Sequence, residues 1–168
     1  MIDIQELNNE ARTLAIENGL CEKWQDMWAK DWPLEKMVHM FYRGIDFFIS
    51  TRFLPDNKMV EWVGTDFMRE NGILVNDRYS LVNPSYVITT GKTETTIRMN
   101  ANNAATIYLC DDSTATLEAK NRSFVIVHLY GNATLKATAS GDAHVCAIVH
   151  SDKAKVIDDG NIVIKNDI

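Results

Sequence analysis

The sequence predicts an α+β fold in which an N-terminal helical region is followed by a short two-walled β-solenoid (a β-helix) of about four coils. Three observations predict it: a repeat of ten residues in the second half, apolar residues at every second position within each repeat, and turn-forming residues between repeats. Ten residues cannot hold both a helix and a strand, so each repeat should form one strand and one turn. We expect helices over residues 1–72, short linking strands over 73–84 and the solenoid over 85–166.

The repeat is visible as seven short segments, each centred on an aliphatic residue. The centres are Val87, Ile97, Ile107, Leu117, Val127, Leu135 and Val145, and a weaker pair follows at Val156 and Val163. The step between centres is ten residues, except for a step of eight from Val127 to Leu135. The positions two residues before and after a centre are mostly Ala, which predicts a narrow interior. Gly, Asn and Asp separate the segments, and they tolerate the left-handed backbone of tight corners.

The outward positions of successive segments alternate in character. Segments centred on 97, 117 and 135 place Thr and charged residues outward, whereas the segments between them place aromatic and aliphatic residues outward. Two strands per coil would gather these residues on two distinct walls, whereas three would mix them. We expect the apolar wall to be a binding surface formed by Tyr86, Ile88, Tyr108, Ile126, His128, Tyr130, Cys146 and Ile148. A patch of this size needs a cover, which could be the N-terminal region, a second copy of the chain or a partner.

The N-terminal region shows the apolar spacing of amphipathic helices. Helices are expected over residues 4–18, 20–28, 33–49 and 55–71. Gly19 and Gly72 are suited to end the first and the last of them, and Pro33 and Pro55 are suited to first turns. Because the ends of a solenoid need protection, we expect this region to cap the first coil, to cover the apolar wall or to act as an oligomerisation element.

Charge and composition argue against several classes of function. The net charge is −6, and residues 1–84, with 14 acidic and 9 basic side chains, carry −5 of it. No basic stripe is present, so direct binding of DNA is not expected. No apolar run approaches the ~20 residues of a membrane span. The first residues lack the pattern of a signal peptide, and the three widely spaced cysteines are typical of a reducing compartment. We therefore expect a cytoplasmic protein with no membrane interaction.

No motif for catalysis, cofactor binding or metal binding stands out. We therefore expect no catalytic residue, no cofactor and no metal, and we do not expect an enzyme. One alternative stays open, because a two-strand coil would stack Tyr108, His128 and Cys146 in one column, with His144 and His150 on the strand of Cys146. Imidazole and thiolate can bind zinc, and a Cys next to a His can form a nucleophilic pair. A metal-binding enzyme that uses this wall is the least favoured reading.

The repeats resemble those of small accessory proteins carried by phages and prophages, which have a helical start followed by Ala-Thr-Val-type repeats. The matching stretches are residues 113–119 (STATLEA), 131–137 (GNATLKA) and 141–145 (GDAHV), within a likeness that covers about half of the chain. The resemblance implies a β-solenoid encoded by a phage or another mobile element.

Small size, acidity and the lack of a catalytic set favour a rigid, non-catalytic protein-binding module. On a mobile element, such a module would inhibit a host defence complex of the CRISPR type, by binding the nuclease complex or its guide RNA in the cytoplasm of the host cell. The alternative from another class is a structural or adhesive piece related to phage fibres. We expect a homo-oligomer.

Overall fold

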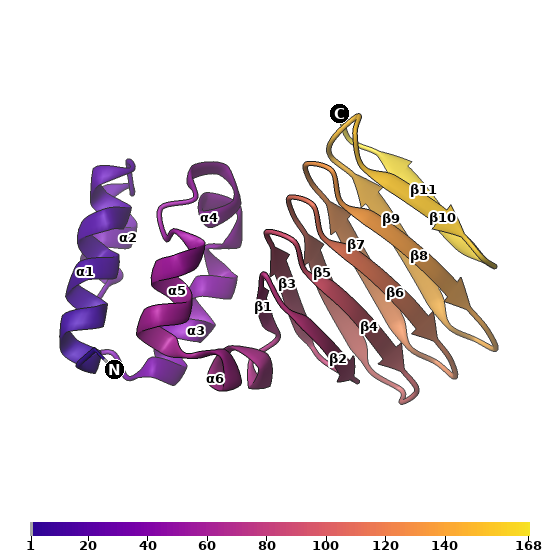
Figure 1. Cartoon of the computed structure of the whole chain (residues 1–168), viewed down its shortest axis with the longest axis horizontal. Coiled ribbons are helices and arrows are strands. Elements are labelled where there is room, and N and C mark those ends of the chain that lie inside the picture. Colours follow the sequence, from indigo (N-terminus) through magenta and orange to yellow (C-terminus); the bar gives the residue numbers. More distant parts are fainter. Residues whose placement is uncertain (1) are drawn as a thin grey trace. The chain divides into compact units, whose positions relative to one another are not determined.

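The computed structural model describes residues 2–168, which form six helices followed by eleven strands (Figure 1). The chain divides into two compact units, one ending at Phe67 and the other beginning at Met68. The predicted fold class is confirmed, because the helices come first and are followed by parallel strands stacked as a two-sheet β-solenoid. Among residues 2–168, no helix has the length and the apolar character needed to span a membrane.

The helices are shorter than the apolar spacing predicts. They are α1 (Ile4–Glu17), α2 (Glu22–Met27), α3 (Leu34–Arg43), α4 (Ile45–Thr51), α5 (Asp56–Val63) and α6 (Thr65–Glu70). The helix expected over 33–49 breaks at Gly44, whose N–H bonds to the carbonyls of Met40 and Phe41 and closes α3. The helix expected over 55–71 breaks at Gly64, where φ is +87°. Glycine adopts this conformation without steric cost, and an α-helix cannot continue through it.

A buried amide organises the helical unit. Asn8 on α1 is only 1% exposed, and it lies beside the buried Leu7 and Ala11. Trp28 Nε1 donates to Asn8 Oδ1 at 2.6 Å, and Asn8 Nδ2 donates to the Ala29 carbonyl at 2.9 Å. Because a buried polar group without a partner is costly, these two bonds fix the segment after α2 against α1.

The strands alternate between two sheets. They are β1 (Ile73–Val75), β2 (Arg78–Val82), β3 (Tyr86–Thr90), β4 (Glu94–Met99), β5 (Ala104–Leu109), β6 (Thr114–Ala119), β7 (Phe124–Leu129), β8 (Thr134–Ala139), β9 (His144–Val149), β10 (Lys155–Asp158) and β11 (Ile162–Asn166). The odd-numbered strands form one sheet, which we name sheet A, and the even-numbered strands form sheet B. Each strand therefore pairs in parallel with the strand two places further along the chain, as the stacked arrows of Figure 1 show.

The register corrects the irregular step that the sequence indicates. From β4 to β9 the strands begin at residues 94, 104, 114, 124, 134 and 144, a constant step of ten. Leu135 pairs with Ala115, and Ala137 pairs with Leu117. The true centres of β8 and β9 are therefore Ala137 and Ala147, because register follows the backbone and not the largest side chain.

The residues expected to link the two regions form the first coil. β1 pairs with β3, and β2 pairs with β4, so the solenoid already begins at Ile73. Arg69, near the end of α6, donates from Nε and Nη2 to the two oxygens of Asp77 at 2.8 and 2.7 Å. This hydrogen-bonded pair lowers the pKa of the Asp77 carboxyl, which is further stabilised by the N–H of Arg78.

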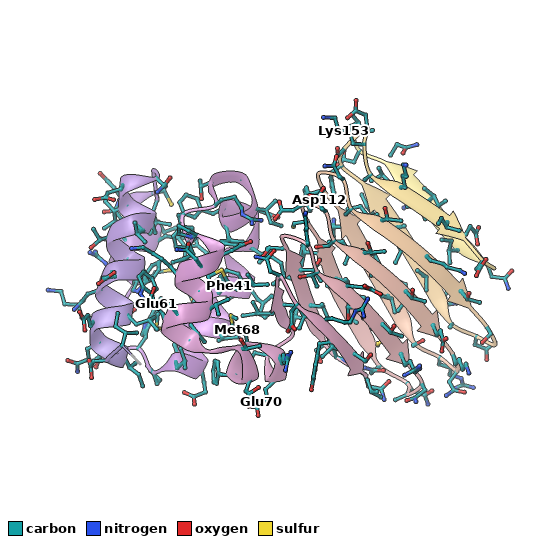
Figure 2. The ribbon with its side chains drawn as sticks, in the orientation of Figure 1. Phe41, Glu61, Met68, Glu70, Asp112 and Lys153 are labelled. Atoms are coloured by element: carbon teal, nitrogen blue, oxygen red, sulfur yellow. The ribbon has the colours of Figure 1, made fainter. Side chains whose placement is uncertain are left out.

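The interior and the corners follow the predicted pattern. Inward side chains such as Ile107, Leu117 and Val127 are at most 1% exposed. Positive φ angles recur at the corners, with Asp111 at 59°, Asn121 at 58° and Gly131 at 61°. Figure 2 shows Asp112 and Lys153 at one edge of the solenoid, where the corners that follow β5 and β9 lie.

Candidate functional site

The outer face of sheet A presents two columns of side chains that run from strand to strand. The first column is Tyr86, Thr106, Ile126, Cys146 and Val163. The second column is Ile88, Tyr108, His128, Ile148 and Lys165. Most of the predicted apolar wall therefore does lie on one face of one sheet. Tyr86 is the most exposed of the predicted residues, at 51%, whereas Tyr108, Ile126, His128, Cys146 and Ile148 are half-buried.

Ile88 is placed differently from the expectation. Its side chain points to the outer face of sheet A but is fully buried, at 0% exposed. β1 adds a strand beside β3, and this strand places Ile73, itself 5% exposed, in register with Ile88. Ile88 therefore belongs to the packed start of the solenoid and offers no surface for docking.

The expected column of Tyr108, His128 and Cys146 is wrong in its last member. Ile148 is in register with His128, while Cys146 is in register with Ile126. The error follows from the expected step of eight residues from Val127 to Leu135, whereas the structure has a step of ten. This difference moves every residue of β9 by two positions relative to β7. Within residues 2–168, no group of three or more His, Cys, Asp or Glu side chains is arranged to hold a metal ion.

Four aromatic side chains stack at the C-terminal ends of β5, β7 and β9, and we name them the ring cluster: Tyr108, His128, Tyr130 and His150. The ring centroids of Tyr108 and His128 lie 5.1 Å apart with planes 10° from parallel. His128 and His150 are also 5.1 Å apart, and Tyr130 lies 4.5 Å from His150. The Tyr108–His128 and Tyr130–His150 spacings are close to the distance of about 4.8 Å between neighbouring strands, so the solenoid itself sets these two stacks.

A chain of polar contacts runs through the two imidazoles. Nδ1 of His128 and Nε2 of His150 lie 2.8 Å apart. Nδ1 of His150 lies 3.3 Å from Oδ2 of Asp167, which follows β11. With both rings neutral, both contacts are hydrogen bonds only if His150 donates from Nδ1 to Asp167 and accepts at Nε2 from His128.

The outer face of sheet B has the opposite chemistry. From β4 to β8 its side chains are threonines and charged residues, joined along the sheet by ion pairs, and exposed Val82 and Ile157 lie at the two ends of the sheet. Arg98 Nε lies 3.5 Å from Glu118 Oε2, and Lys136 Nζ lies 3.3 Å from Asp159 Oδ2. At the start of the sheet, a hydrogen bond to Glu94 raises the pKa of the exposed Arg78. This face is a solvated surface, as the sequence indicates.

Three residues of sheet A were not among the predicted wall residues. Phe124, the first residue of β7, is 49% exposed and lies in register with Ala104 and His144. The alternation of the repeat would have included Phe124 if the segment around Val127 had been extended by one further outward position. His150, which was expected only as a possible metal ligand, follows the end of β9, and Asp167 follows the end of β11.

Comparison of the chain with protein-family models, with curated proteins and with solved structures finds no match in any of the three.

Proposed function

We propose that the protein is a non-catalytic protein-binding module whose docking surface is the outer face of sheet A. The contrast between the two faces of one repeat supports this proposal. The docking face consists of the ring cluster and of Tyr86, Phe124, Ile126, Cys146 and Ile148. Between β3 and β9 these side chains carry no acid or permanent cation, whereas the same repeats carry Arg98, Glu118 and Lys136 on sheet B. Interface centres are depleted in charge and enriched in Tyr and Phe in the same way.

The size of the docking face restricts the partner. Strands of six residues and five stacked rungs give a face of about 20 by 20 Å, or roughly 400 Å². A stable interface needs about 800 Å² per partner. The partner should therefore present a flat, apolar, uncharged centre and should also contact a corner of the solenoid. Since the face is held by parallel strand pairing, little ordering entropy is lost on docking.

The most specific form of the proposal is a phage-encoded or mobile-element protein that inhibits a host defence nuclease complex of the CRISPR type in the cytoplasm. The resemblance of the three stretches at 113–119, 131–137 and 141–145 to repeats of phage accessory proteins supports this form. A second copy of the chain on the same face is the competing occupant, and it would make the protein a homo-oligomer.

A structural, fibre-like role has one observation in its favour. The coil formed by β10 and β11 exposes Ile157, Val163 and Ile164 at 50%, 57% and 45%. The same coil places Asp158 in register with the inward Ala137, and Asn166 in register with the inward Val149. An inward-pointing charge at a sheet edge opposes continuation of the sheet, so this end is protected against stacking. We therefore prefer the binding module.

The test compares two matched variants, Phe124→Asp and Thr114→Asp. Both residues are exposed and open a six-residue strand, Phe124 on sheet A and Thr114 on sheet B. The full chain is mixed with a purified RNA-guided nuclease complex, and both co-elution and target cleavage are measured. We expect the wild type and Thr114→Asp to co-elute and to inhibit, and Phe124→Asp to do neither.

Light scattering on the same samples separates the occupants. If the wild type is a dimer and Phe124→Asp is a monomer, the occupant of the docking face is a second copy of the chain and not the nuclease complex. Equal behaviour of the two variants would refute the assignment of sheet A as the docking face.

A further inference from the structure

The corners that follow β4, β6 and β8 form a polar groove, and we propose that this groove binds a neutral saccharide chain. Its polar lining comes from three successive corners and consists of Asn100, Asn102, Asn121, Arg122 and Asp142. The groove has a volume of about 570 Å³, within the range of ~300–1,000 Å³ that is typical of small-molecule sites. It lies on the edge of the solenoid opposite to the corners of Asp112 and Lys153, which Figure 2 labels.

The asparagines of the groove are held in place and still have hydrogen-bonding groups to offer. Asn100 Oδ1 accepts from Asn83 Nδ2 at 2.7 Å, and Asn121 Nδ2 donates to the Asn100 carbonyl at 2.6 Å. Within residues 2–168, no protein group pairs with Asn100 Nδ2, with Asn121 Oδ1 or with the amide of Asn102. Because two of the three amides are already ordered by the corners, a ligand that binds them loses little of its binding energy to ordering.

Arg122 and Asp142 add one charge of each sign, so the lining as a whole is neutral. Arg122 Nε lies 3.9 Å from Asp142 Oδ2, which is too far for a hydrogen bond, and the two side chains are 77% and 81% exposed. The guanidinium therefore keeps its N–H donors, and the carboxylate keeps its acceptors. Amide, guanidinium and carboxylate groups each present two coplanar polar atoms, which match two adjacent hydroxyls of a sugar ring.

An aromatic ring lies close to this polar lining. Phe124 follows Arg122 by two residues, opens β7 and is 49% exposed. Its neighbour on the preceding rung is Ala104, whose methyl group is too small to cover the ring. Among the described residues, Phe124 stacks on no other ring, in contrast to the members of the ring cluster. An open aromatic ring is suited to pack against the C–H face of a sugar, while the groove binds the hydroxyls.

Other classes of ligand fit the groove less well. A phosphate group would face the carboxylate of Asp142 beside the one cationic side chain of the lining. A divalent cation needs several oxygen ligands, and the lining contains a single carboxylate. An apolar ligand would find only the side chain of Ala101. A peptide strand needs unpaired backbone groups, whereas these corners pair between coils, as in the 3.0 Å bond from the Phe124 N–H to the Asn103 carbonyl.

The test is an NMR titration of the isotope-labelled full chain with neutral trisaccharides of glucose, mannose, galactose and N-acetylglucosamine. Each is added to about 20 mM, which detects dissociation constants in the millimolar range. We expect at least one of them to shift the side-chain amide signals of Asn100, Asn102 and Asn121 in a saturable way. Inorganic phosphate is the competing probe. If no trisaccharide gives a saturable shift, or if phosphate gives the stronger one, the proposal is wrong.

Matched variants locate the site. Asn102→Ala should weaken binding about 2–10-fold, and Arg122→Ala about 10-fold or more, because a charged partner contributes more than a neutral one. Asn132→Ala changes the same position of a corner on the opposite edge and should leave the affinity unchanged. Phe124→Tyr should keep the affinity, whereas Phe124→Leu should lower it. Equal binding by the wild type, Asn102→Ala and Arg122→Ala would overturn the assignment. Neither Asn102 nor Arg122 belongs to the docking face, so this result is separate from the test of the proposed function.

Discussion

Two corner glycines with the same backbone geometry offer a sharp test of how the coils stack. Gly91 and Gly141 both have φ of +64°. A Cβ added at Gly141 would lie 3.6 Å from the nearest atom, an ordinary contact with Asn121. A Cβ added at Gly91 would lie 2.1 Å from Asn76 Oδ1 in the corner below. The two Gly→Ala variants therefore share the backbone cost and differ in one steric conflict.

The expected magnitudes follow from this difference. An Ala in the left-handed region costs about 1–2 kcal/mol, and the stiffer unfolded chain returns about 0.4–1 kcal/mol. Gly141→Ala should thus destabilise by about 1 kcal/mol. Gly91→Ala must also move the Asn76 side chain, whose Oδ1 accepts the N–H of Lys92 at 2.9 Å. Loss of that bond adds about 1 kcal/mol, for a total of about 2 kcal/mol.

Urea unfolding followed by far-ultraviolet circular dichroism measures both variants, each in the wild-type chain and in Asn76→Ala. In the Asn76→Ala background the obstructing group is gone, so Gly91→Ala should cost no more than Gly141→Ala. If the two variants are equal in the wild-type background, or if their difference survives Asn76→Ala, the corner of the first coil is not packed as described.

Three further predictions concern other parts of the chain. Asp77→Ala should destabilise the solenoid by about 1.5–3 kcal/mol near neutral pH because it removes a charged hydrogen-bonded pair. The pKa of Asp77 is lower in the folded state than in the unfolded state. Its contribution to stability is therefore present above the unfolded-state pKa of about 3.9 and is lost as the pH falls through the folded-state pKa. The urea midpoints of the variant and the wild type should converge in acid. Leu117→Ala, at a site 1% exposed, should cost about 2–5 kcal/mol in the same assay, while Lys136→Ala should stay within about 0.5 kcal/mol. Asn8→Ala removes the partner of Trp28 Nε1 and of the Ala29 carbonyl, so it should destabilise the helical unit. The expected result is a lower urea midpoint of unfolding followed by tryptophan fluorescence. This signal reports on the helical unit because all four tryptophans lie before residue 68.

Sequence alone predicted the architecture of the second half because its signals are local. Alternation along one strand assigns each residue to the inside or the outside, and a Gly, Asn or Asp at each corner marks where the strand ends. Both signals survive in the structure from β3 to β9. The helix breaks at Gly44 and Gly64 gave no comparable signal, because the apolar stripe continues on both sides of each glycine.

The parts that could not be predicted depend on contacts between distant segments. The full burial of Ile88 could not be predicted from its own strand, because alternation places this side chain on the outer face, and its pairing with Ile73 of β1 is a property of the coil. The contact of Asp167 with His150 depends on the last corner. Ile162 is in register with Val145, a step of 17 residues, whereas Val145 is in register with Val125, a step of 20. A period read from the earlier repeats places Asp167 away from the ring cluster.

The step of ten residues also explains why one sequence repeat can carry two chemistries. Ten residues are half a coil, so consecutive repeats fall on opposite sheets and can diverge independently. Removing twenty residues, a whole coil, would leave every later strand in its own sheet. Removing ten residues, one strand and one turn, would move every later strand to the opposite sheet. If the ten residues removed are 110–119, which lie between β5 and β7, the strand that holds His128 would move to sheet B, away from the column of Tyr108. Neither the ring cluster nor the uncharged face could then form, although every repeat would still satisfy the local pattern of a strand and a turn. The uncharged outer face of sheet A is therefore a property of repeat parity, which selection on the local pattern alone would not maintain.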